Sequence, residues 1–93
     1  MILHVVQYSA VQDNALATCL RYIQPRDTLL LIGDGVNALL QRRWQQALHD
    51  TKVCLLEQDV EARGLQARLG QYQQLSQAEF VQYSLTHAKV ITW

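Results

Sequence analysis

Apolar residues along this chain follow two rhythms, one typical of strands and one typical of helices. Continuous apolar runs of strand length lie at residues 2–7, 28–33, 52–57 and 89–93, and a weaker one lies at 72–75. Continuous runs indicate strands whose two faces are both covered. Between the runs, apolar residues recur at intervals of three and four, as on one face of a helix. Strands and helices therefore alternate along the chain, beginning and ending with a strand.

Capping and breaking residues delimit the first predicted helix. The segment Ser9–Gln12 has the form of a capping box, in which side chains at both ends bind free backbone amides. An apolar stripe formed by Leu16, Cys19 and Ile23 follows it. Pro25 stops this helix because it cannot continue the backbone hydrogen bonding.

The three later helices are delimited in the same way. An apolar stripe predicts one continuous helix from Val36 to about His49. A short helix is expected over Asp59–Arg63, and Gly64 can end it in a left-handed cap. A second capping box, at Ser76–Glu79, opens the last helix.

This alternation with short connections predicts an α/β fold. We expect a five-stranded, mostly parallel sheet with helices on both faces, a three-layer α/β/α arrangement built with right-handed crossovers. No linker or repeat divides residues 1–93, so we expect one domain. Sites in such sheets lie at the carboxyl ends of the strands, near the topological switch point. The turn at Gly33 is one of those ends.

Charge and composition exclude several classes of partner. Eight basic residues balance eight acidic ones, so nothing marks a surface for nucleic acid or anionic lipid. No apolar run approaches the roughly 20 residues of a membrane-spanning helix, and the beginning of the sequence does not resemble a signal peptide. We therefore expect a cytoplasmic protein without direct nucleic-acid or membrane contact. The scattered histidines predict no metal site, and no cofactor is expected.

The turn Gly33-Asp34-Gly35 admits two interpretations. With Ala38 it matches the G-x-G-x-x-A fingerprint of dinucleotide-binding domains, and Glu57 follows where an acidic ribose partner is expected. However, Asp34 would place a carboxylate where the pyrophosphate should bind. Aspartate is also a good helix N-cap, able to satisfy the free amides itself. The residues thus favour a self-capped structural turn over a nucleotide site.

The two cysteines are candidate thiol groups of unequal interest. Cys19 lies on the apolar stripe of the first helix, and Cys54 lies in the middle of a buried strand. Free cysteine is among the most buried residue types, so both are expected to be inert. On the residues alone the chain is not an evident enzyme.

Trp93 places a large aromatic side chain at the last residue of the sequence, which is unusual. A terminal residue frays into water unless something holds it. Either it pairs as part of the final strand of its own sheet, or it packs on a partner, where tryptophan is enriched as an anchor. Both can hold together.

Several segments, in order and over nearly the whole chain, resemble the TusB/DsrH family of small sulfur-relay subunits. They read "ILHVV", "LATCLRY", "DTLLLIGDGVNALL", "VCLLEQDVEARGL" and "HAKVITW". The most specific parts are L-x-x-DG-V-x-A and D-x-x-ARG, and the final tryptophan fits as well. The resemblance implies a DsrE-like α/β fold.

The same resemblance implies partners and a pathway. Family members assemble with homologous TusC and TusD subunits into a heterohexamer of two copies each. The TusBCD complex passes persulfide sulfur from TusA to TusE, toward 2-thiolation of the wobble uridine of certain tRNAs. The related DsrEFH complex serves sulfur oxidation. Which of the two relays this chain serves stays open.

The resemblance also bears on individual residues. It places Leu56 or Glu57 where the catalytic subunit carries its nucleophilic cysteine, so this chain is expected to be a non-catalytic subunit. DsrH-type members carry a cysteine matching Cys19, which stays a weak candidate for an auxiliary persulfide carrier. We expect the partner interface to include the five residues Asp34, Gly35, Glu57, Gly64 and Trp93.

Overall fold

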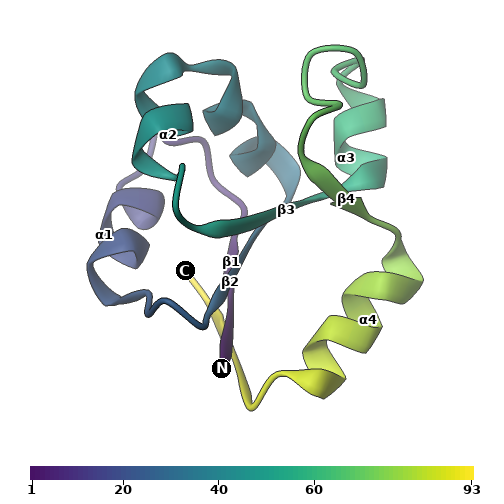
Figure 1. Cartoon of the computed structure of the whole chain (residues 1–93). Helices are drawn as coiled ribbons and strands as arrows, with labels where there is room; N and C mark the ends of the chain where they lie inside the picture. Colours follow the sequence, from purple (N-terminus) through teal and green to yellow (C-terminus); the bar gives the residue numbers. More distant parts are fainter.

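The computed structural model describes residues 1–93 and contains a five-stranded parallel sheet with helices on both faces (Figure 1). The strands are β1 (Ile2–Val6), β2 (Thr28–Leu31), β3 (Lys52–Leu56), β4 (Gln73–Leu75) and β5 (Lys89–Thr92). The α-helices are α1 (Ala15–Tyr22), α2 (Arg42–Ala47), α3 (Glu57–Ala62) and α4 (Gln77–Thr86), and η1 (Gly33–Leu40) is a 3-10 helix. The predicted α/β class and all five strands are confirmed. No helix is both long and apolar enough to cross a membrane.

The strand order β4-β3-β2-β1-β5 determines which helices cover which face. The chain moves in one direction from β1 to β4 and then returns past β1 to β5. Because crossovers between parallel strands are right-handed, the outward connections lie on one face and the return connection through α4 lies on the other. Figure 1 shows this separation, with α1 and α2 on one side of the sheet and α4 on the opposite side. The topological switch point is therefore between β1 and β5.

Two cores of different size flank the sheet. Thirteen buried residues form the core beneath α1, η1, α2 and α3, and five form the core on the α4 side. Alternation along β2 divides its side chains, since Leu29 and Leu31 enter the larger core and Leu30 enters the smaller one. Helix α4 has no buried residue of its own and covers the sheet mainly with Phe80 and Tyr83.

The predicted capping box at Ser9–Gln12 is wrong. Helix α1 begins only at Ala15, whose N–H is bound by the Asp13 carboxylate at 2.7 Å. The Ser9 hydroxyl instead accepts from the N–H of Val11, and the Ser9 carbonyl accepts two further amides, which closes a turn. Serine forms such local bonds as readily in turns as at helix starts, so the motif alone did not locate the helix.

The predicted continuous helix from Val36 to His49 is also wrong, because it is divided at Gln41. Gln41 is extended, with φ −102° and ψ 130°, and separates η1 from α2. With three residues per turn, the 3-10 helix places Val36 and Leu39 on the same side of η1, facing the larger core. The extended Gln41 changes the direction in which the next side chains point, so that Trp44 of α2 faces the same core. The apolar pattern read as one helix because both halves face the same core.

Two other local predictions are confirmed. Ser76 and Glu79 form a complete capping box at the start of α4, with bonds of 3.1 and 2.9 Å. Gly64, at φ +64°, adopts the left-handed conformation just after α3.

Candidate functional site

The carboxyl edge of the sheet is held together by four residues from two separate segments, which we call the edge latch: Gly33, Asp34, Asp59 and Arg63. The Gly33 N–H donates to the Asp59 carboxylate at 2.8 Å. Arg63 donates to the Asp34 carboxylate at 2.8 Å and to the Asp59 backbone carbonyl at 3.1 Å. These contacts join the start of η1 to α3, so the two segments form one surface at the ends of β2 and β3.

The edge latch brings together two short motifs of the sequence. Gly33 and Asp34 belong to L-x-x-DG-V-x-A, and Asp59 and Arg63 belong to D-x-x-ARG. The motifs lie 26 residues apart at the Gly33–Asp59 bond, yet they bind each other directly. Sequence reasoning singled out both motifs without showing that each is the other's partner.

The two glycines of the turn serve different steric purposes. Gly33 has φ +53°, a conformation that residues with a Cβ rarely adopt. Gly35 has no positive φ, but a Cβ there would lie 2.5 Å from the Val6 carbonyl oxygen at the end of β1. The turn therefore needs glycine for backbone conformation at one position and for close approach to a neighbouring strand at the other.

The geometry gives no support to a phosphate site at this turn. The Gly33 amide, which a phosphate would need, is already occupied by Asp59. The predicted capping role of Asp34 is wrong, since η1 begins after Ile32 without a side-chain cap and Asp34 pairs with Arg63 instead. The carboxylates of Asp34, Asp59 and Glu57 all belong to this edge, which is unfavourable for an anionic ligand.

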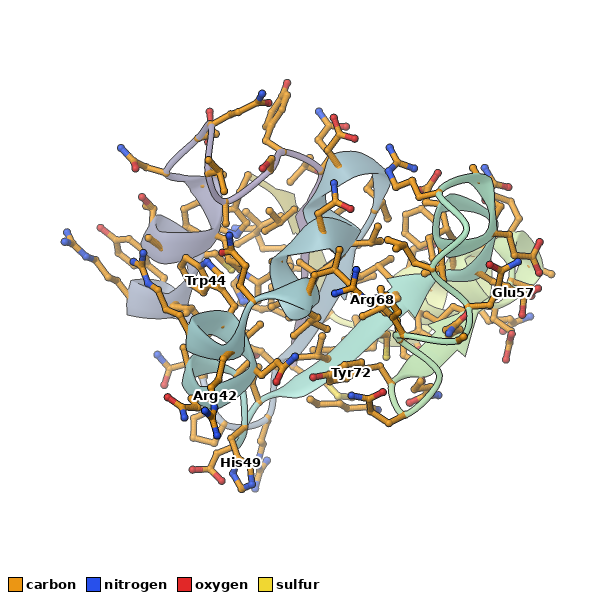
Figure 2. The ribbon with its side chains drawn as sticks, turned by 90° about the horizontal axis from the view of Figure 1, so that it is seen from above. Arg42, Trp44, His49, Glu57, Arg68 and Tyr72 are labelled. Carbon is orange, nitrogen blue, oxygen red and sulfur yellow. The ribbon has the colours of Figure 1, made fainter.

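Most of the predicted interface residues lie on this edge. The side chain of Asp34 is 60% exposed, and Glu57 and Gly64 are also exposed. Gly35 is buried beneath them against β1. Figure 2, which looks down from above, shows Glu57 on the opposite side of the molecule from Arg42. The edge is thus an accessible surface supported by a hydrogen-bonded turn.

Trp93 lies apart from the edge latch, beside the switch point. Its backbone N–H donates to the Val5 carbonyl at 2.9 Å, which continues the β1–β5 pairing. Its indole Nε1 donates to His4 Nδ1 at 3.1 Å, and its ring stacks on Tyr22 at 5.7 Å between centroids. The expectation that its own sheet holds this residue is confirmed, while contact with a partner stays a prediction.

Both thiols are buried in the two cores. Cys19 has no exposed surface, and burial, with the nearby Asp27 carboxylate, raises its pKa to about 11. At neutral pH its thiolate fraction is then on the order of 1 in 10,000. Cys54 is equally buried, and burial raises its pKa as well. The positions where the resemblance places a nucleophile are Leu56 and Glu57, neither of which can supply a thiol.

Sequence reasoning missed the buried polar pair formed by His4 and Asp27. His4 Nε2 lies 2.9 Å from the Asp27 carboxylate, and both side chains are almost fully buried. Burial by itself raises the pKa of the Asp27 carboxyl, but hydrogen bonds from Gln24 N–H, His4 and Ile2 N–H hold that pKa below its usual range. Two features of the sequence could have indicated this pair: His4 lies inside the first apolar strand, and Asp27 directly precedes the second.

Comparison with known proteins finds one matching family and several similar sequences. The family model described as DsrH like protein matches residues 8–90. Protein TusB of Klebsiella pneumoniae subsp. pneumoniae is 32% identical over 96 aligned residues, covering 99% of this chain and all of that protein. Protein TusB of Cronobacter sakazakii is 37% identical over 78 residues, covering 80% of this chain and 82% of that protein.

A solved structure supports the fold independently. The solution NMR structure of protein Tm0979 from Thermotoga maritima superposes with a TM-score of 0.65, covering 89% of this chain and 90% of that chain. The two sequences are 24% identical, so this likeness bears on the fold alone.

Proposed function

Because the chain belongs to the DsrH-like protein family, we propose that it serves as a TusB-type subunit of a sulfur relay without carrying sulfur itself. Its partners in this proposal are TusC- and TusD-like subunits, in a heterohexamer with two copies of each. The complex receives persulfide sulfur from TusA and passes it to TusE, toward 2-thiolation of the tRNA wobble uridine. In this proposal the chain is a structural subunit of the complex and performs no sulfur chemistry itself.

The observation that carries the non-catalytic part of this proposal is the burial of both thiols. A persulfide carrier needs an accessible thiolate that attacks a sulfane sulfur. Cys19 and Cys54 have no exposed surface, and both have raised pKa values. The carboxyl edge, in contrast, offers an exposed and internally braced surface of the kind a partner can bind.

Replacement of each thiol tests whether this chain carries sulfur. Cells that lack the native gene should regain wild-type tRNA 2-thiolation with either Cys19→Ala or Cys54→Ala. Intact-mass analysis after exposure to a persulfide donor should show no added sulfur on the folded chain. Sulfane sulfur that is present on the wild type and absent from Cys19→Ala would instead support the auxiliary-carrier alternative in a DsrEFH-type complex.

Charge reversal at the carboxyl edge tests the interface. We expect Glu57→Lys to weaken co-purification with the TusC- and TusD-like subunits, because Glu57 is exposed on the proposed contact surface. Arg42→Glu is the matched control, since Arg42 is also exposed but lies on the opposite side in Figure 2. If both variants and the wild type co-purify equally well, Glu57 is not part of the interface. If the wild-type chain co-purifies with neither partner, the assembly role is refuted.

A further inference from the structure

A buried polar chain connects three separate segments of the fold, and the proposed relay role does not use it. It runs from the Asp27 carboxylate, before β2, through the imidazole of His4 on β1 to the indole of Trp93 after β5. His4 is 1% exposed and Asp27 is 4% exposed. Groups of this kind persist in a core only when their hydrogen bonds are satisfied, and no buried side-chain polar atom of this structure lacks a partner.

The two bonds of His4 define its protonation state. Indole Nε1 can only donate, so His4 Nδ1 must accept and carries no proton. The proton therefore sits on Nε2 and is donated to Asp27. His4 is neutral in this arrangement, and a second proton can bind only at Nδ1, the atom that holds Trp93.

We propose that protonation of His4 at Nδ1 releases the side chain of Trp93 from the sheet, so that Trp93 forms an acid-sensitive contact between β1 and the end of β5. Protonation turns the acceptor into a donor, and two N–H groups then face each other across 3.1 Å.

The surroundings determine which partner moves. Asp27 stays bonded to the imidazolium and also accepts from the backbone N–H groups of Ile2 and Gln24, so His4 keeps its place. The other titratable groups around this cluster are Cys19 and Tyr22 of α1, together with Asp50 and Lys52, which line the same pocket as Asp27. None of these four is hydrogen-bonded to His4, whose ring nitrogens bind Asp27 and Trp93.

Trp93 is the more exposed member of the pair, although it also packs against the edge of the larger core. It is only partly buried, and its stacking partner Tyr22 is 62% exposed. The ring planes of His4 and Trp93 differ by 22° while the hydrogen bond joins their edges, so the imidazolium does not lie over the indole face. A cation–π attraction, which requires that position, does not replace the lost bond.

The indole N–H resonances of the wild-type protein test this proposal. The chain has two tryptophans, and Trp93→Phe identifies which signal belongs to residue 93. Between pH 8 and pH 5 we expect the protection factor of the Trp93 indole N–H to fall at least tenfold. The backbone N–H of Ile32, which binds the Val6 carbonyl at 3.0 Å between β1 and β2, serves as the internal reference and should keep its protection.

Variants at residue 4 show whether the imidazole is responsible. His4→Asn offers a carboxamide oxygen that does not titrate, and His4→Gln serves as a second variant should the first fail to fold. Either folded variant should show no pH-dependent loss of protection. An unchanged Trp93 signal in the wild type, an equal change in the variant, or loss of protection of the Ile32 amide at pH 5 would each overturn the proposal. None of these outcomes depends on the relay role.

Discussion

Substitution of Gly35 by alanine introduces one methyl group at the tightest backbone contact of the carboxyl edge. The added Cβ would lie 2.5 Å from the Val6 carbonyl oxygen. That oxygen cannot move freely, because it accepts the Ile32 N–H at 3.0 Å and so links β1 to β2. Relief of the clash must therefore displace the start of η1 or break this bond.

The magnitude follows from three opposing contributions. Overpacking at a close contact costs about 1–3 kcal/mol. Weakening the Ile32–Val6 hydrogen bond adds about 0.5–1.5 kcal/mol. Alanine offsets about 0.4–1 kcal/mol by restricting the unfolded chain, since Gly35 has no positive φ. The net destabilisation is about 0.5–4 kcal/mol, which for a chain of this size lowers Tm by roughly 2–30 °C.

Thermal unfolding followed by circular dichroism measures this effect, and Gly64 provides the matched control. A Cβ at Gly64 meets nothing within 4 Å, so Gly64→Ala suffers only from its φ of +64°. Gly64→Asn should recover most of that loss because asparagine tolerates this conformation, whereas Gly35→Asn should be worse than Gly35→Ala. A Tm for Gly35→Ala within about 2 °C of the wild type would refute the close-contact reasoning.

Three further outcomes follow from the same structure. Asp59→Ala should leave the Gly33 N–H without its acceptor, cost about 1 kcal/mol in urea unfolding and speed exchange of that amide; unchanged exchange would contradict the edge latch. The pKa of Asp27 is lower in the folded state, so its contribution to stability is present above the unfolded pKa of about 3.9 and is lost as pH falls through the folded pKa. Asp27→Asn should remove that part of the acid dependence when the free energy of unfolding is measured by chemical unfolding at pH 2–7. Parallel plots of this free energy against pH for the wild type and the variant would refute the argument. Cys19 and Cys54 should react with a disulfide reagent at pH 7.5 only when the chain unfolds, so rapid labelling of the native protein would contradict their burial.

The sequence by itself determined the fold class, the five strands and the family. The fold class and the strands depend on local patterns that survive in any context, since apolar runs separated by helical periodicity allow few arrangements other than a parallel sheet. The family was identified separately, from the resemblance of whole segments and their motifs. The capping box at Ser76–Glu79 and the left-handed Gly64 were predictable for the same reason, because their partners lie within a few residues.

Predictions failed where a local motif had a stronger competing use. Ser9 forms a turn instead of a helix cap, and Asp34 pairs with Arg63 instead of capping η1. The helix expected from Val36 onward is divided because both of its halves must face one core, a requirement that periodicity alone does not distinguish from a single helix.

Only the tertiary structure decided how distant segments are paired. The bond from Gly33 to Asp59 spans 26 residues, and the bond from Trp93 to His4 spans 89. Such contacts depend on strand order, and an apolar run does not encode which strand lies beside it. Placing β5 next to β1 brings the last residue of the sequence against a histidine near its beginning, and the same strand order brings the two family motifs into contact at the carboxyl edge.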